Sequence, residues 1–216
     1  MIKALLFDLD GTLLHSDPLH FEVFQGLYAE RGRELTEAGY LSDIHGRHNL
    51  DAFPELFPGE DAQSLSDLKE ARFRDKLEDG HAPMPGALAL IAAARSKGWR
   101  IAVVTNAPRV NAEAMLGAIG LRDSFELLVI GDECARAKPD PEPYLAAMRA
   151  FDVAPQECIA FEDSPSGMRA AAGSGAHAVG ILSSGLSADQ LRAAGAQTVI
   201  TDYTDPALAE LLSRLE

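Results

Sequence analysis

A pair of aspartates directly behind a short apolar run near the N-terminus constrains the fold most strongly. Residues 4–7 (Ala-Leu-Leu-Phe) have the pattern of a buried strand, and Asp8 and Asp10 follow it. Because side chains alternate along an extended chain, both carboxyl groups are expected on the same side. In open α/β sheets, this end of a strand is where ligands bind. The alternative is a solvated turn, in which aspartate and glycine are common.

The second half of the chain alternates between two patterns and predicts a single parallel sheet. Apolar, β-branched segments alternate with segments of helical spacing from residue 87 onward. The expected strands are 100–104, 127–130, 158–161, 177–181 and 198–200, and the expected helices are 87–97, 109–118, 141–151 and 165–173, with two more starting near 187 and 205. Apolar strands joined by short crossover helices indicate an α/β, Rossmann-like core with helices on both faces.

Residues 18–81 lack this alternation and have the spacing of an almost entirely helical segment. We therefore expect a Rossmann-like catalytic core made of residues 1–15 and 83–216, interrupted by a helical cap domain over residues 16–82. The expected hinges are 15–18 and 82–85, both of which contain proline. A helical insertion at this position is suited to act as a lid over a site.

Composition narrows the class of ligand and the compartment. The 216 residues carry a formal net charge of −14, with a sequence pI near 4.8, which argues against general binding to nucleic acids or anionic membranes. Cys134 and Cys158 have neither metal-site nor redox spacing. The first apolar run is interrupted too early for a signal peptide, and no stretch reaches the length of a membrane span. We therefore expect a cytoplasmic protein.

Three later strand ends also carry polar side chains. Thr105 and Asn106 follow one expected strand, where they suit a phosphate oxygen or simply cap the next helix. Lys138 precedes a proline, and is either a fixed positive charge or a solvated loop lysine. Glu162 and Asp163 end another expected strand and suit Mg²⁺, although acids there also favour a helix N-terminus. Their coincidence at one edge of one sheet indicates a site for phosphate and a metal ion.

These segments resemble the motifs of the haloacid dehalogenase-like phosphatase superfamily. They occur in the family's order and span essentially the whole chain, as residues 8–12 (Asp-Leu-Asp-Gly-Thr), 105–106 (Thr-Asn), 138–139 (Lys-Pro) and 162–167 (Glu-Asp-Ser-Pro-Ser-Gly). Specifically, the chain resembles the branch with a helical cap inserted after the first strand. That branch includes phosphoglycolate phosphatase and β-phosphoglucomutase.

The resemblance implies a role for each motif residue. Asp8 would be the nucleophile that forms an aspartyl-phosphate, and Asp10 the general acid and base. The implied phosphate-binding residues are Thr105, Asn106 and Lys138, and the implied Mg²⁺ ligands are Asp8, the backbone carbonyl of Asp10, Glu162 and Asp163. The dehalogenase branch lacks an acid at the position of Asp10. An acid there favours phosphate esters, whose leaving group needs a proton.

The resemblance also points to three substrate-binding candidates in the cap. His20 and Lys69 are similar in position to a histidine and a lysine of the mutase-like relatives. Arg47 follows a cap glycine but lies closer to it than the mutase's phosphate-clamping arginine does. The alternatives are a packed histidine and two solvated helix residues.

We therefore expect a monomeric, Mg²⁺-dependent phosphatase that acts on a small phosphorylated metabolite, such as a sugar phosphate or phosphoglycolate. One alternative is a β-phosphoglucomutase-like mutase, against which the spacing of Arg47 argues. Another is a non-catalytic protein that binds a phosphorylated ligand. The presence of Asp8, Asp10, Lys138 and Asp163 together argues against that reading, because a lapsed enzyme has no chemical need for all four.

Overall fold

The computed structural model describes residues 1–78 and 80–215. The chain divides into two compact units. Met1–His15 and Gly80–Glu216 form the first, which we call the sheet unit, and Ser16–Asp79 form the second, which we call the helical insert. The sheet unit is therefore assembled from two segments of the chain that the insert separates.

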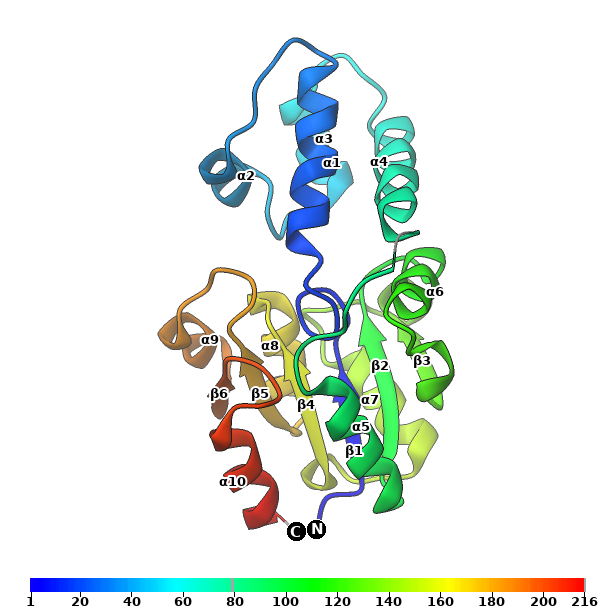
Figure 1. Ribbon diagram of the computed structural model, residues 1–216, viewed down its shortest axis with the longest axis vertical. Helices are drawn as coiled ribbons and strands as arrows, with labels where there is room; N and C mark the ends of the chain where they lie inside the picture. Colours follow the sequence, from blue (N-terminus) through cyan, green and yellow to red (C-terminus); the bar gives the residue numbers. More distant parts are fainter. Residues whose placement is uncertain (79, 216) are drawn as a thin grey trace. The chain divides into compact units, whose positions relative to one another are not determined.

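The sheet unit is built on a six-stranded parallel sheet in the order β3-β2-β1-β4-β5-β6 (Figure 1). Its strands are β1 (Ala4–Phe7), β2 (Arg100–Thr105), β3 (Leu127–Ile130), β4 (Cys158–Glu162), β5 (His177–Ile181) and β6 (Thr198–Ile200). The central strand β1 places Phe7 opposite Val103 of β2 and Phe161 of β4. The predicted Rossmann-like fold is confirmed, with each strand within one residue of its expected end.

Helices cover both faces of the sheet, as Figure 1 shows. They are α5 (Ala87–Ser96), α6 (Arg109–Ala118), α7 (Glu142–Phe151), α8 (Pro165–Gly173), α9 (Ala188–Ala194) and α10 (Pro206–Leu215). Ala4 and Leu6 of β1 lie on the face that packs against residues of α7, α8 and α9. On the other face Phe7 stacks on Phe161, with ring centroids 4.9 Å apart, and meets Tyr203 edge-on. The strands are thus buried on both sides.

Local signals explain where the helices around the strand ends begin. Ser164 caps α8 by accepting a hydrogen bond from the Gly167 N–H at 3.0 Å, and Pro165 occupies the first turn. Ser187 caps α9 and forms a capping box with Gln190. Both helices start where the sequence predicts.

Across residues 1–78 and 80–215, no helix has the length and apolar character needed to cross a membrane.

The helical insert forms α1 (Asp17–Ala29), α2 (Glu37–Asp43), α3 (Asn49–Leu56) and α4 (Ala62–Leu77). Its core is largely aromatic, with Phe24, Tyr40 and Phe53 among the buried side chains. Thr36 and Asp61 cap α2 and α4 through their side-chain oxygens. Residues 16–78 of the insert contribute no strand to the sheet, so the site at the strand ends can be described within the sheet unit alone.

Candidate active site

Three carboxyl groups meet at the carboxyl ends of β1 and β4. Asp8 directly follows β1, Glu162 is the last residue of β4, and Asp163 follows it. One ligand oxygen from each residue lies within 4.8 Å of the others, and all three side chains are buried. Because β1 and β4 pair in parallel, the topology brings together residues that are far apart in the sequence. Such a carboxylate set matches the ligands that Mg²⁺ prefers.

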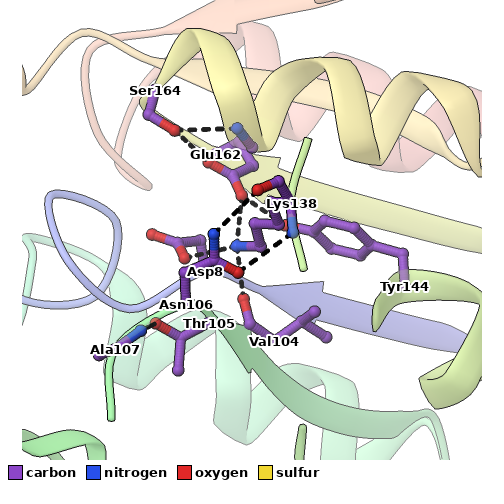
Figure 2. Close-up of polar contacts among 10 residues, drawn as sticks. Asp8, Val104, Thr105, Asn106, Ala107, Lys138, Tyr144, Glu162 and Ser164 are labelled. Atoms are coloured by element: carbon purple, nitrogen blue, oxygen red, sulfur yellow. Dashed lines mark hydrogen bonds and ion pairs between the residues drawn. The ribbon is translucent and has the colours of Figure 1, made fainter. Parts of the chain in front are cut away.

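Lys138 links the ends of the two strands. Its Nζ donates hydrogen bonds to Asp8 Oδ1 and Glu162 Oε1, each at 2.6 Å, and to the Val104 carbonyl at 2.7 Å (Figure 2). An ammonium group has three protons to donate, so these contacts use all of them. A phosphoryl oxygen can therefore bind Lys138 only by replacing one of these partners.

Burial and charge together perturb the ionisation of this cluster. Burial is the largest cause that raises the pKa of Asp8 to about 8, the charge of Glu162 raises it further, and Lys138 opposes both. Burial alone would lower the pKa of Lys138, but the charges of Asp8 and Glu162 outweigh it and raise that pKa. When all are ionised, Asp8, Glu162, Asp163 and Lys138 carry two more negative charges than positive ones.

The donor set therefore fits a divalent cation. A cation among these carboxylates supplies opposite charge, which favours the ionised forms. Glu162 Oε1 already accepts hydrogen bonds from Lys138 and Tyr144, so Oε2, with one long contact of 3.4 Å from Ser164, has capacity left. Asp8 and Asp163 are the other two ligand candidates that lie within reach.

Tyr144, on α7, is a member of this network that sequence reasoning did not identify. Its hydroxyl donates to Glu162 Oε1 at 2.7 Å, and Lys138 Nζ lies 5.1 Å from the centroid of its ring. Burial raises the pKa of Tyr144 well above its usual value, and the charge of Glu162 adds to the effect. An aromatic residue at apolar helical spacing indicates only a core position. The sequence therefore contains no local signal for its polar contact.

Asp10 and Gly11 form the turn after β1. Asp10 is half-buried, its backbone pairs with Leu14, and its charge contributes to the raised pKa of Asp8. Gly11 has a φ of +66°, and a Cβ there would lie 2.0 Å from Asp163 Oδ2. A Cβ on Gly167 would similarly lie 1.9 Å from Glu162 Oε1. Both glycines are needed because the backbone passes directly against a carboxylate.

Thr105 and Asn106 lie at the end of β2, next to β1. Thr105 is buried, and its Oγ1 accepts a hydrogen bond from the Ala107 N–H at 3.0 Å. The Asn106 side chain donates to the Lys138 carbonyl at 3.1 Å and accepts from the Lys138 N–H at 3.2 Å. The phosphate-binding role of Asn106 stays a prediction, and in the structure its side-chain amide bonds to the main chain of Lys138. Neither residue caps α6, which begins after Pro108 without a side-chain cap.

The loop after β5 also reaches these strand ends. Ser184 Oγ donates to the Asp163 carbonyl at 2.7 Å, and Ser183 Oγ donates to the Gly11 carbonyl. Sequence reasoning did not identify either serine. The signal that singled out the other strand ends, polar residues just after an apolar strand, is present here too.

In the helical insert, two of the three candidate residues lie together. His20 stacks on Phe73 with ring centroids 4.0 Å apart, and Lys69 Nζ lies 5.5 Å from the same centroid. Lys69 is buried and pairs with Glu70 at 2.8 Å. Burial alone would raise the pKa of Glu70, but the charge and hydrogen bond of Lys69, together with smaller contributions from His20 and Asn49, outweigh it and lower that pKa. The aromatic ring of Phe73 is thus shared by both candidates.

Arg47 has different partners within the insert. Its guanidinium pairs with Glu55 at 2.8 Å and donates to the backbone carbonyls of Asp43 and Asp51. These contacts join the end of α2 to α3. A phosphate-binding role for Arg47 would require their exchange for a ligand.

Fold and site together place the molecule among the α/β proteins with a Rossmann-like parallel sheet, whose ligands bind at the carboxyl ends of the strands. The sequence profile of haloacid dehalogenase-like hydrolases matches residues 2–175. The chain therefore belongs to this family. Its order of motifs along β1, β2, the Lys138 loop and β4 agrees with that membership.

Relatives are similar over nearly their full length. Phosphoglycolate phosphatase from Rhodospirillum rubrum is 34% identical, over 94% of this chain and 88% of the relative. Protein CbbY from Cereibacter sphaeroides is 33% identical, over 95% and 94% respectively. A crystal structure of a Rhodobacter sphaeroides CbbY mutant in complex with xylulose-(1,5)bisphosphate has a TM-score of 0.77 at 29% identity, covering 94% of this chain and 95% of that one. The chain is a phosphatase, a phosphoric monoester hydrolase of the phosphoglycolate phosphatase-like branch.

Proposed function

We propose that this protein is a Mg²⁺-dependent phosphatase that removes phosphate from a small phosphorylated sugar or sugar acid through an aspartyl-phosphate on Asp8. The observation that carries the proposal is the buried cluster of Asp8, Glu162 and Asp163, in which Lys138 pairs with the first two. The similarity to a phosphoglycolate phosphatase and to a CbbY mutant in complex with xylulose-(1,5)bisphosphate supports the substrate class.

Asp8 is the proposed nucleophile. Its carboxylate attacks phosphorus, a bond forms between an Asp8 oxygen and phosphorus, and the bond from phosphorus to the ester oxygen breaks. Lys138 now donates to Asp8 Oδ1, and its other two protons are held by Glu162 and the Val104 carbonyl. As Asp8 gains the phosphoryl group, Lys138 can transfer its hydrogen bond to a phosphoryl oxygen while remaining anchored.

Asp10 is the proposed acid and base. It protonates the departing alkoxide in the first step and takes a proton from the attacking water in the second. That water then displaces Asp8 from phosphorus, which releases inorganic phosphate and regenerates the free carboxylate. The half-buried position of Asp10 beside Asp8 is consistent with access to both solvent and substrate.

Asp8, Asp163, Oε2 of Glu162 and the backbone carbonyl of Asp10 are the groups that would hold Mg²⁺. When bound, Mg²⁺ offsets the negative charge of the phosphoryl oxygens and orients them. The remaining residues anchor this arrangement: Asn106 fixes the backbone of Lys138, and Tyr144 fixes Glu162.

The helical insert is the proposed cap domain, which selects the substrate. His20 and Lys69, gathered on Phe73, are its proposed substrate-binding pair. Arg47 is a weaker candidate because its guanidinium joins α2 to α3 through Glu55 and two backbone carbonyls, whereas Lys69 pairs with its sequence neighbour Glu70. Replacing Lys69 by methionine should therefore change the ranking of substrates more than the same change at Arg47.

The test is phosphate release from a panel that contains phosphoglycolate, pentose and hexose phosphates, sugar bisphosphates and nucleotides, each with Mg²⁺ and with EDTA. We expect release that depends on Mg²⁺ and favours one small phosphorylated sugar or sugar acid. Release that is unaffected by EDTA would contradict the metal assignment. Isomerised sugar phosphate without net release would replace the proposal with a mutase.

A further inference from the structure

Two serines in the loop after β5 contact both sides of the proposed metal site. Ser184 is buried and donates to the main-chain carbonyl of Asp163 at 2.7 Å. Ser183 donates to the carbonyl of Gly11, the residue after Asp10, and its Oγ lies 3.5 Å from Asp163 Oδ2. The loop after β5 therefore connects the ends of β1 and β4.

The acceptors of these hydrogen bonds decide what the serines do. Both serines donate to a neutral main-chain carbonyl, Ser184 to that of Asp163 and Ser183 to that of Gly11. Ser183 Oγ has a second, longer acceptor in Asp163 Oδ2, at 3.5 Å. The serines therefore hold the main chain from which Asp163 projects mainly through carbonyl groups, and the contact with its carboxylate is the longer one.

Close packing makes this fixation matter. Gly11 lies so near Asp163 that a Cβ on the glycine would come within 2.0 Å of Oδ2. A small shift of the Gly11 backbone would therefore move either the Asp163 carboxylate or the neighbouring Asp10 carbonyl. Ser183 holds the Gly11 side of this contact, and Ser184 holds the Asp163 side.

We infer that Ser183 and Ser184 are positioning residues that set the affinity of the site for its divalent cation. The inference rests on the proposed function, because it takes Asp163 as a metal ligand. Groups that orient metal ligands typically change metal affinity or activity by about 10-fold to 100-fold when removed. Each serine should therefore affect metal binding more than it affects the folded state.

The experiment compares Ser183→Ala and Ser184→Ala with Ser187→Ala. Ser187 lies in the same loop but caps α9, where its side chain accepts from the Gln190 N–H at 3.3 Å. Mn²⁺ binding to each protein without substrate is measured from the free-ion EPR signal, and melting temperature is measured in EDTA. We expect binding weakened by about 10-fold or more in the first two variants. Ser187→Ala should lower the melting temperature and leave Mn²⁺ binding unchanged.

A conservative variant and a kinetic readout separate positioning from general damage. Ser183→Thr keeps the hydroxyl and should retain wild-type Mn²⁺ affinity. The variants at Ser183 therefore still test the inference if Ser184→Ala fails to fold. In phosphate release, the two alanine variants should need more Mg²⁺ for half-maximal rate and recover most of the rate when Mg²⁺ is saturating. Wild-type Mn²⁺ affinity in Ser183→Ala, or equal losses in Ser183→Ala and Ser187→Ala, would overturn the inference. A wild-type protein that neither binds Mn²⁺ nor releases phosphate would instead overturn the proposed function.

Discussion

The sheet unit buries ion pairs between residues far apart in the sequence, whereas most ion pairs of the helical insert, like the other pairs of the sheet unit, lie nearer the surface. In the sheet unit, Lys138 is buried and pairs with Asp8 and Glu162, which are 130 and 24 residues away in the sequence. In the insert, pairs such as Lys76 with Glu22 lie at the surface, with side chains 38% and 53% exposed. Removing charges from water is costly, whereas exposed pairs cost and contribute little. Buried ion pairs therefore indicate residues that serve chemistry rather than stability.

Lys69 and Glu70 are where the insert departs from its own pattern. Their side chains are 7% and 18% exposed, and His20 stacks close by on Phe73. By the reasoning that separates the two units, this buried pair is the part of the insert in which a functional role is most expected.

The largest expected effect tests the sheet unit at its nucleophile. Asp8→Asn keeps the size of the side chain but removes the attacking carboxylate, so phosphate release should fall by at least about 10⁴-fold. Unchanged near-ultraviolet circular dichroism would show that the fold is retained. A variant that keeps a rate near that of the wild type would remove Asp8 from the mechanism and weaken the contrast between the units.

A matched pair of lysine substitutions tests the contrast itself. Lys138→Met leaves Asp8 and Glu162 buried without their partner and should lower the free energy of unfolding by about 3–5 kcal/mol. Lys76→Met removes an exposed pair and should change it by about 1 kcal/mol or less. Urea unfolding followed by circular dichroism measures both. Equal losses would mean that burial does not distinguish the two pairs.

A matched pair of tyrosine substitutions is expected to give a smaller difference. Tyr144→Phe removes the hydrogen bond to Glu162 and should cost about 1.5–3 kcal/mol, as for bonds to charged groups. Tyr28 is also buried, but its hydroxyl makes no hydrogen bond with the described part of the chain. Tyr28→Phe should therefore change urea stability much less. A larger loss at Tyr28 would contradict the role given to the Tyr144 hydroxyl.

The smallest expected effect concerns pH and the insert. The hydrogen bond with Asp17 raises the pKa of His45 above its usual 6.5, against the opposing effect of burial. The protonated imidazole is thus favoured in the fold, so its stabilisation is complete below pH 6.5 and is lost as pH rises through the raised pKa. Imidazole titration by NMR should give that raised value. His45→Gln should remove the corresponding part of the pH dependence of unfolding, and an unchanged profile would contradict it.

Most of the fold follows from local signals in the sequence. The apolar runs of β2 and β4 and the caps at Ser164 and Ser187 act on neighbouring residues, so the bounds of these strands, to within one residue, and the starts of α8 and α9 could be predicted. The order of the strands depends on which of them pair, and no local pattern encodes it. The position of β1 between β2 and β4 therefore became apparent only in the structure.

The candidate site was predictable to the same extent and for the same reason. Asp8 and Asp163 follow strands, Glu162 ends β4, and Lys138 lies in the loop between β3 and α7. A parallel sheet brings such positions together. The hydrogen bonds between the Asn106 side chain and the main chain of Lys138 join residues 32 positions apart, and the sequence did not predict them. Long-range contacts of this kind leave no trace in the spacing of residues along the chain.

The glycines at 11 and 167 have a practical consequence for protein engineering. At each position the site depends on glycine's lack of a β-carbon, because a β-carbon would collide with the carboxylate of Asp163 or Glu162. A mutant library aimed at new substrates should keep these two codons fixed, because a β-carbon at either position would displace a carboxylate of the proposed metal site. Diversity is better directed to the insert, around the proposed substrate-binding pair Lys69 and His20, where a changed side chain should alter recognition and leave the reaction intact.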